Sequence, residues 1–173
     1  MENTNQKNVA ALIVEKALKC LGETETPNNS GFVDKAFEEA MKTTGWQKGE
    51  SWCCYFTELI WKEAYAGNDL ILKELDRLFS ASATKTFSNF KHSGFVVSED
   101  PVPGALVLFQ HGNTWMGHAG IVIDIAKDFV ITIEGNTNNN GSRNGTAVCQ
   151  KTRKLHQPSG PYLNILGFVH PHL

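Results

Sequence analysis

The sequence of 173 residues predicts one domain of the α+β class, with helices in the N-terminal half and an antiparallel sheet in the C-terminal half. As far as about residue 91, apolar residues recur at the spacing of amphipathic helices. From Pro101 onward the apolar runs are short, rich in β-branched residues and separated by Gly, Asn and Pro. No linker-like segment divides the two halves, and this length suits a single core. We therefore expect residues 1–173 to form one unit in which the helices cover the sheet.

The helices are predicted from apolar stripes and from the residues that end them. Over residues 7–21, Val9 and Ile13 share one stripe, and Gly22 ends the helix. Turn-forming residues predict a loop over residues 23–31. The further helices are predicted over residues 32–42, 51–66, 69–79 and 83–91.

The strands are predicted from short β-rich runs bounded by turn residues. They cover residues 105–109, 119–125, 129–133, 146–150 and 165–170. Because the strands follow the helices rather than alternating with them, an antiparallel sheet is expected.

The charge balance excludes several classes of protein. Sixteen basic and eighteen acidic residues give a net charge of −2, and no basic run exceeds two residues, so no nucleic-acid partner is expected. The longest apolar run near the start, Val9–Val14, is too short to span a membrane. It also lacks the basic flank and cleavage site of a signal peptide. We therefore expect synthesis in the cytoplasm, no membrane insertion and, if the protein is exported, a route without a signal peptide.

The four cysteines are expected to be free thiols. Cys53 and Cys54 are adjacent, which suits neither a spaced disulfide framework nor a chelating C-x-x-C pair. Cys20 and Cys149 stand alone, and a chain without a signal peptide is expected to keep its thiols reduced.

Cys53 is the candidate nucleophile. If Ser51 is the N-cap of the helix over residues 51–66, Cys53 lies in the first turn, where the helix dipole favours the reactive thiolate. Cys53 shares the apolar stripe with Phe56, which should face the sheet. Cys54 lies about 100° away, on a face with Glu58 that we expect to be solvated. The alternative is that both cysteines are small buried filler.

His118 is the candidate base among six histidines. It begins a predicted strand in which Ala119 and Ile121 alternate on the buried side, so His118 and Gly120 share the other face. The remaining five lie in loop-like segments or near the C-terminus, where a surface position is expected: His92, His111, His156, His170 and His172.

Two polar residues are predicted to lie beside His118. If residues 126–128 form a three-residue hairpin loop, counting outward places Glu134 opposite Gly120. The same register places Asn136 opposite His118. All four side chains then share one face, and the glycine leaves room for the imidazole and its partner. A loop shorter by one residue would reverse the faces, so the prediction depends on this register.

A thiol, an imidazole and a polar group that orients the imidazole form the arrangement used for nucleophilic acyl transfer. Taken alone, Glu134 is better read as an ordinary carboxylate at a strand end, and Asn136 as a turn former. Together with Cys53 and His118, they form a candidate catalytic site.

Four segments in this order resemble a known family. They are Ser-Trp-Cys-Cys-Tyr-Phe (51–56), Pro-Val-Pro-Gly-Ala-Leu-Val-Leu-Phe (101–109), Gly-His-Ala-Gly-Ile-Val (117–122) and Ile-Glu-Gly-Asn-Thr (133–137). The chain resembles the CHAP family, the cysteine, histidine-dependent amidohydrolases/peptidases, and more broadly the NlpC-like papain-fold cell-wall hydrolases. The segments around Gly22 and Asn29 are similar to compact phage and prophage members, so the resemblance covers about residues 20–171.

The resemblance implies a papain-like fold, in which a cysteine-bearing helix packs on a five- to six-stranded, antiparallel, partly barrel-shaped sheet. It implies that Cys53 is the nucleophile, His118 the base and Glu134 the residue that orients it, while Asn136 matches an additional polar position. Cys54 departs from the small residue that the family usually has there. Neither a metal nor another cofactor is expected.

The activity implied by the resemblance is cleavage of an amide bond in peptidoglycan through a thioester. Both N-acetylmuramoyl-L-alanine amidase and peptide endopeptidase chemistry remain open. We expect a monomer without a separate wall-binding module, which reaches the wall after holin-type release or non-classical secretion. The alternatives are an antibacterial effector with an immunity partner, a protein-directed deamidase or protease of this fold, and a catalytically silent binding domain.

Overall fold

The computed structural model describes residues 4–139 and 145–172, and it confirms the α+β class. The α-helices of this part of the chain are α1 (Thr4–Lys19), α2 (Lys35–Lys42), α3 (Cys53–Ala64), α4 (Asp69–Leu78) and α5 (Ala83–Lys91). Its strands are β1 (Val97–Ser98), β2 (Leu106–His111), β3 (Gly117–Ala126), β4 (Phe129–Thr137), β5 (Ala147–Lys154) and β6 (Leu163–Val169). In the described ranges, no helix is long and apolar enough to cross a membrane.

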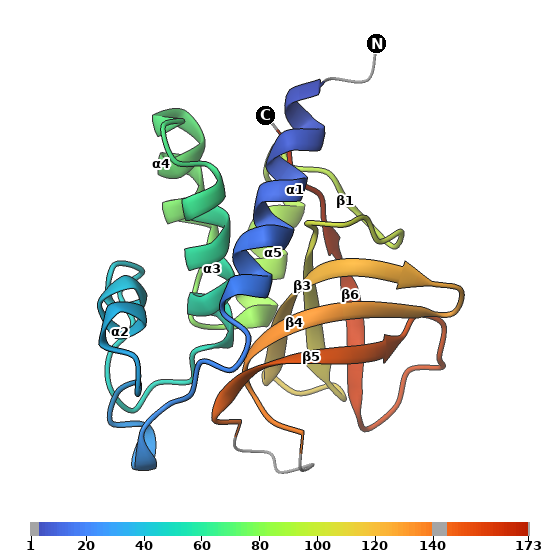
Figure 1. Ribbon diagram of the computed structural model, residues 1–173. Helices are drawn as coiled ribbons and strands as arrows, with labels where there is room; N and C mark the ends of the chain where they lie inside the picture. The colour runs from blue at the N-terminus through green and yellow to red at the C-terminus, as the bar shows by residue number, and fades with distance from the viewer. Residues whose placement is uncertain (1–3, 140–144, 173) are drawn as a thin grey trace.

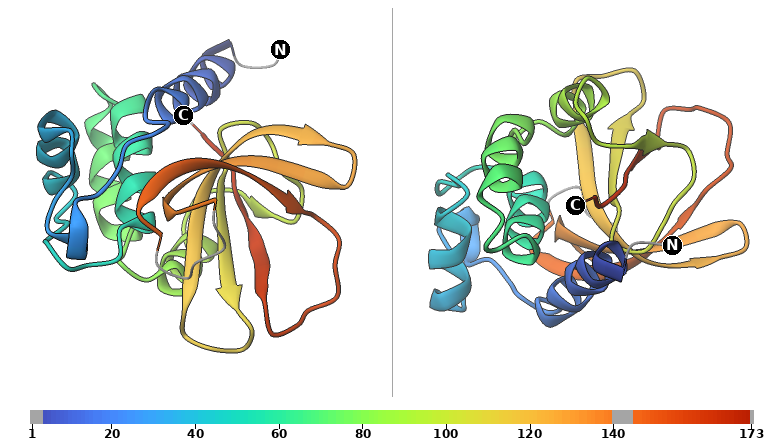
Figure 2. Two further views of the ribbon diagram at one scale, coloured as in Figure 1. Left: turned by 60° about the horizontal axis from the view of Figure 1, so that its bottom comes forward. Right: turned by 90° about the horizontal axis from the view of Figure 1, so that it is seen from above.

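The six strands form one antiparallel sheet in the order β1-β6-β2-β3-β4-β5. The sheet is strongly curved, and the helices gather beside it (Figures 1 and 2). All five predicted strands are present, and the two-residue strand β1 was not predicted. Helix α2 begins three residues later than expected because Asp34 caps it. The expected papain-like arrangement, a helix carrying Cys53 against a curved sheet, is confirmed.

Apolar side chains cover both faces of the sheet. Towards the helices, Leu106, Ala119 and Ile133 pack in the larger core with residues of α1, α3 and α5. Inside the curve of the sheet, Phe109 and Val122 belong to a second, smaller core. Alternation along the strands divides the residues between these two cores. A polar group on the inner face is therefore enclosed by the sheet rather than exposed to solvent.

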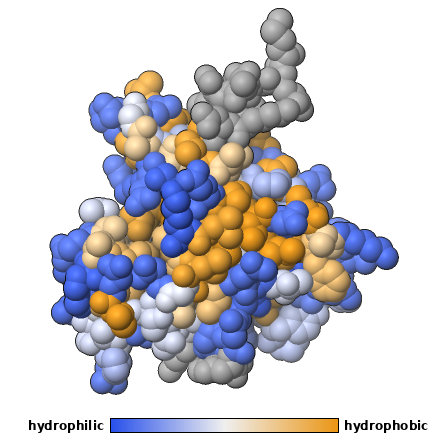
Figure 3. All heavy atoms as spheres, in the orientation of Figure 1, coloured by the Kyte–Doolittle hydropathy of each residue, from blue (hydrophilic) through white to orange (hydrophobic). Residues whose placement is uncertain are grey.

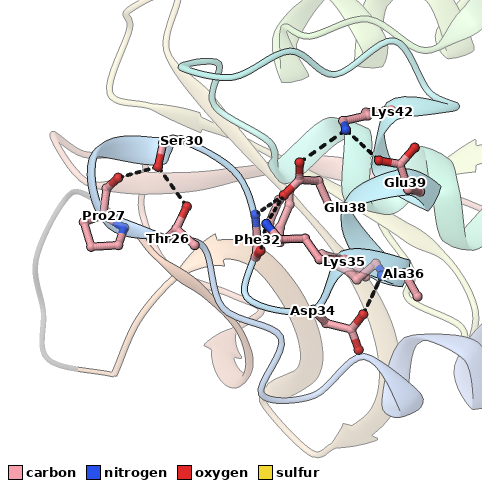
Figure 4. Close-up of polar contacts among 11 residues, drawn as sticks. Thr26, Pro27, Ser30, Phe32, Asp34, Lys35, Ala36, Glu38, Glu39 and Lys42 are labelled. Atoms are coloured by element: carbon pink, nitrogen blue, oxygen red, sulfur yellow. Dashed lines mark hydrogen bonds and ion pairs between the residues drawn. The ribbon is translucent and has the colours of Figure 1, made fainter.

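The segment before α2 holds an aromatic side chain against the start of α3, and Figure 4 shows the polar contacts that fix this segment. Asp34 accepts hydrogen bonds from two backbone N–H groups of the first turn of α2. Glu38 accepts from the Phe32 N–H at 2.9 Å and from Lys35 Nζ at 2.8 Å. The Phe32 ring then packs edge-on against Trp52 with centroids 5.0 Å apart. This contact fixes the residue directly before α3 and hence the start of that helix.

The hairpin between β3 and β4 differs from the predicted one. Its turn has two residues, because Ala126 pairs with Phe129, so the expected three-residue loop is wrong. Lys127 has φ +53°, the left-handed conformation that such tight turns require. A bulge at Ile123 adds one residue to β3 and compensates for the shorter turn. Beyond the bulge the register is therefore the one predicted.

Apolar residues are also exposed, both on α1 and at the end of the β3–β4 hairpin (Figure 3). Leu18 of α1 is 40% exposed, and Ile125 and Phe129 at the hairpin are 39% and 42% exposed. The predicted alternation placed Ile125 on the buried side, which is wrong because the end of the hairpin extends beyond the helices that cover the sheet.

Candidate active site

Cys53 is the first residue of α3 and is buried, with 6% of its surface exposed. The residue that precedes the helix is Trp52, and no side chain caps it, so the expected N-cap role of Ser51 is wrong. The Cys53 sulfur accepts a hydrogen bond from the Ala119 N–H of β3. The thiol therefore lies between the start of a helix and the sheet, where both the dipole and a backbone donor favour its anion.

His118 is the second residue of β3 and connects the thiol with a carboxylate. Its Nε2 lies 2.8 Å from Glu134 Oε2, and its ring also hydrogen-bonds the Cys53 thiol. With Nε2 facing Glu134, Nδ1 is the nitrogen available to the sulfur. The Phe109 ring lies beside the imidazole, with centroids 6.0 Å apart and planes at 30°. The ring is therefore held at both nitrogens and on one face.

Glu134 is fully buried in β4 and is satisfied by three partners. Besides His118, Thr132 Oγ1 donates to Oε1 at 2.7 Å. Arg153 donates from Nε to Oε1 at 2.9 Å and from Nη2 to Oε2 at 2.5 Å. The approach requires a glycine opposite, because a Cβ on Gly120 would lie 2.7 Å from Glu134 Cγ. The predicted proximity of His118, Gly120 and Glu134 is confirmed.

These contacts set the charges of the site. A hydrogen bond from the Cys54 thiol, together with the hydrogen bond and charge of His118, holds the pKa of Cys53 well below its usual range despite burial. The contact with Cys53 and burial raise the pKa of Cys54. Burial alone would lower the pKa of His118, but Glu134 and Cys53 outweigh it and raise the pKa to about 10. Burial alone would raise the pKa of Glu134, but Arg153 and His118 hold it well below its usual range.

Asn136 lines the same pocket as these residues without a hydrogen bond to the imidazole. The paired register of β3 and β4 ends at Ile121 and Ile133, and Asn136 has φ +53°, which interrupts the extended strand. Among the described residues no hydrogen bond joins Asn136 to His118. The predicted pairing of these two residues is therefore wrong, because the backbone of β4 turns away from β3 before this point.

An open pocket of about 420 Å³ lies over the thiol and the imidazole. Its wall includes the turn between β2 and β3, with His111 and Trp115, and the beginning of α5. Trp115 is 80% exposed. Of the loop over residues 135–145, Asn136, Thr137 and Gly145 line the pocket. Residues 140–144 of that loop lie outside the described residues.

The sequence profile of the CHAP domain matches residues 44–136, which is more than half of the chain. The chain belongs to the CHAP domain family. Comparisons with curated proteins and with solved structures found no match. Membership of the CHAP family indicates a cysteine- and histidine-dependent amidohydrolase or peptidase.

The segment that matches the CHAP domain contains the four residues predicted from sequence, whereas Arg153 lies beyond it. Sequence reasoning missed Arg153 because the register between β4 and β5 depends on the loop that joins them. It also missed Thr132, although strand alternation places this residue on the same face as Glu134. In the described part of this CHAP domain, no group of three or more His, Cys, Asp or Glu side chains is placed to hold a metal.

Cys54 does not lie on a solvated face. It is 1% exposed and Glu58 is 7% exposed, so the predicted exposure of this side of α3 is wrong. Helix α3 is covered on this side as well, because α4 and α5 pack around it. All four cysteines are free, as predicted.

Proposed function

We propose that this CHAP domain hydrolyses an amide bond of bacterial peptidoglycan, with Cys53 as the nucleophile and His118 as the acid and base. The observation that carries this proposal is the continuous chain of contacts from the Cys53 sulfur through the His118 ring to the buried Glu134 carboxylate. The thiol at its end opens to a pocket large enough for part of a peptide or glycan.

The proposed reaction begins with the thiolate of Cys53 and the imidazolium of His118. The sulfur attacks the amide carbonyl carbon. The resulting tetrahedral oxyanion accepts a hydrogen bond from the backbone N–H of Cys53, because an N–H in the first turn of a helix has no partner within the helix. His118 then gives its proton to the leaving amine as the C–N bond breaks, which leaves a thioester on Cys53. Next, His118 takes a proton from water, and the hydroxide displaces the sulfur to release a carboxylic acid.

Glu134 is proposed to keep the imidazole in place during these steps. Because Nε2–H donates to the carboxylate, the ring cannot turn away from the sulfur, and its positive form is stabilised. Asn136 is proposed to contact substrate from the pocket wall rather than to orient His118, since it lines the pocket without a hydrogen bond to the ring.

The test is digestion of purified sacculi, with mass spectrometry of the released fragments and Cys53→Ala as the control. An amidase separates the glycan from the stem peptide and creates new N-terminal alanines. An endopeptidase instead creates new amino groups within the stem or cross-bridge. Wild-type protein that leaves sacculi intact but cleaves or deamidates a protein substrate would overturn peptidoglycan as the target.

A further inference from the structure

Arg153 reaches the candidate active site from β5, the edge strand beyond β4. Its backbone pairs with Val130, four residues before Glu134, and its side chain extends along the inner face of the sheet to the carboxylate. The guanidinium binds both carboxylate oxygens through Nε and Nη2. Two parallel hydrogen bonds of this kind fix the orientation of a carboxylate as well as its charge. The guanidinium also lies over the Phe109 ring, 5.5 Å from its centroid.

With Arg153 included, the site is a row of four charged groups of alternating sign. The thiolate of Cys53 and the carboxylate of Glu134 are negative, and His118 and Arg153 are positive. The Glu134 side chain is fully buried, and those of His118 and Arg153 are 13% and 28% exposed. A buried row of charges is stable when the charges compensate one another, and here they sum to zero.

We propose that Arg153 is a positioning residue, whose fork holds the Glu134 carboxylate ionised and in place and thereby sustains the thiolate–imidazolium pair. This inference rests on the proposed role of Cys53, but not on which polymer is cleaved. Without the guanidinium, the row would carry a net negative charge in a buried place. The least costly remedy is one additional proton. On Cys53 it removes the thiolate directly; on Glu134 it removes the charge that stabilises the imidazolium, and a weaker imidazolium in turn supports less thiolate at a given pH.

No other cation in the described ranges contacts this row. The thiol of Cys54 lies beside Cys53, and Glu58 acts on Cys54 from the same helix. Both groups are neutral or negative, so neither can replace the charge of Arg153. Thr132 donates a hydrogen bond to Glu134 but carries no charge.

Arg153 also borders two cavities. It lines the pocket over Cys53 and a second cavity of about 250 Å³, which Lys154 and Tyr162 help to line. Truncation of the side chain to Ala would therefore leave a space that a small ion can enter from solvent. This geometry allows chemical rescue with guanidinium.

The experiment measures the rate at which iodoacetamide alkylates Cys53 as a function of pH, with peptide mass spectrometry to identify the labelled cysteine. In Arg153→Ala the midpoint of alkylation should move to higher pH by about one unit or more, so that at a pH below both midpoints the labelling becomes about tenfold slower. Arg153→Lys keeps the charge but not the two parallel hydrogen bonds, so its midpoint of alkylation should lie between those of the wild type and Arg153→Ala. Guanidinium chloride at tens of millimolar should move the midpoint of Arg153→Ala back, whereas equal sodium chloride should not.

Lys154→Ala is the matched control, because it removes the neighbouring cation, which has no contact with Glu134. Its midpoint should equal that of the wild type. If Arg153→Ala does not fold, Arg153→Gln keeps the length and some hydrogen bonding without the charge, and it should show the same shift. A folded variant without the charge whose midpoint equals that of the wild type would overturn the inference. If the wild type left sacculi intact while the midpoint of alkylation still shifted in Arg153→Ala, only peptidoglycan as the substrate would be overturned, and the role of Arg153 would stand.

Discussion

At the scale of single residues, two adjacent thiols in α3 have opposite properties. Cys53 contacts His118 and the Ala119 N–H, which favour its thiolate, whereas burial and the neighbouring sulfur keep Cys54 protonated. The distinction does not come from exposure, since both thiols are buried. It comes from which sulfur faces the sheet.

Substitution of each thiol by alanine should therefore have different effects on activity. Cys53→Ala should fold normally and be inactive, since it removes the sulfur that attacks the substrate. Cys54→Ala should remain active, although loss of its hydrogen bond to Cys53 should shift activity to somewhat higher pH. Hydrolysis of sacculi over a pH series measures both effects. An active Cys53→Ala beside an inactive Cys54→Ala would show that the nucleophile is misassigned.

The pH dependence of alkylation is a second prediction at this scale. Iodoacetamide at pH 6 should label Cys53 first, because an ordinary thiol of pKa about 8.5 is almost wholly protonated there. Activity should fall as the pH rises through about 10, where His118 loses the proton that it gives to the leaving amine. Labelling of Cys20 or Cys149 ahead of Cys53 at pH 6 would contradict this prediction.

Removal of the His118 imidazole should greatly lower turnover. His118→Ala should lower turnover by about 10² to 10⁴-fold, the usual contribution of general acid–base catalysis. His156→Ala is the control, since this exposed histidine lies in the loop between β5 and β6, away from the residues that line the pocket. Turnover numbers on one preparation of sacculi provide the comparison. A full loss in His156→Ala with little change in His118→Ala would refute the assignment.

At the scale of secondary structure, the β3–β4 hairpin shows how a partly wrong premise led to a correct contact. The two-residue turn alone would have placed His118 and Glu134 on opposite faces of the sheet, because the side-chain period is two. The bulge at Ile123 restores the parity. Sequence alternation indicates which residues share a face along one strand, but not how many residues a turn or bulge takes up between two strands.

The hairpin also makes Gly120 a sensitive position. A methyl group there would meet Glu134 Cγ at 2.7 Å and displace the carboxylate from His118 and Arg153. Since an ångström of misplacement in a catalytic group can cost about 10²-fold, we expect Gly120→Ala to lower turnover about tenfold to a hundredfold. Gly94→Ala is the matched control, because nothing lies within 4 Å of its Cβ position. Equal activity of the two variants would show that the approach of β3 to Glu134 is not needed.

At the scale of the whole molecule, the buried carboxylate links the site to the stability of the fold. The pKa of Glu134 is lower in the folded state than in the unfolded chain, so its contribution is fully present above a pH of about 4.3 and is lost as the pH falls further. The denaturant midpoint of the wild type should therefore fall on acidification below that pH. Glu134→Gln should begin less stable, because Arg153 loses its charged partner, and should depend less on pH in this range. If the denaturant midpoints of the wild type and Glu134→Gln fell equally steeply below pH 4.3, the assigned role of Glu134 would be contradicted.

The helices and strands of the fold could largely be predicted from the sequence, because their patterns are local. Periodicity located α4 and α5 and every strand except β1, which is too short to carry a pattern. The expected exposure of Cys54 failed because helical spacing shows which residues share a face, but not whether α4 and α5 cover it.

The same division applies to the site. The sequence alone indicated that Cys53 lies in the first turn of a helix and that His118 begins a strand, and it indicated Glu134 as the partner of His118. Only the tertiary structure decided that Arg153 completes the row of charges and that, among the described residues, no hydrogen bond joins Asn136 to the imidazole. The physical reason is that alternation and helical spacing act over a few residues of one segment. Contact between β3, β4 and β5 instead depends on turn length, on a bulge and on the reach of a long side chain, which only the packed sheet fixes.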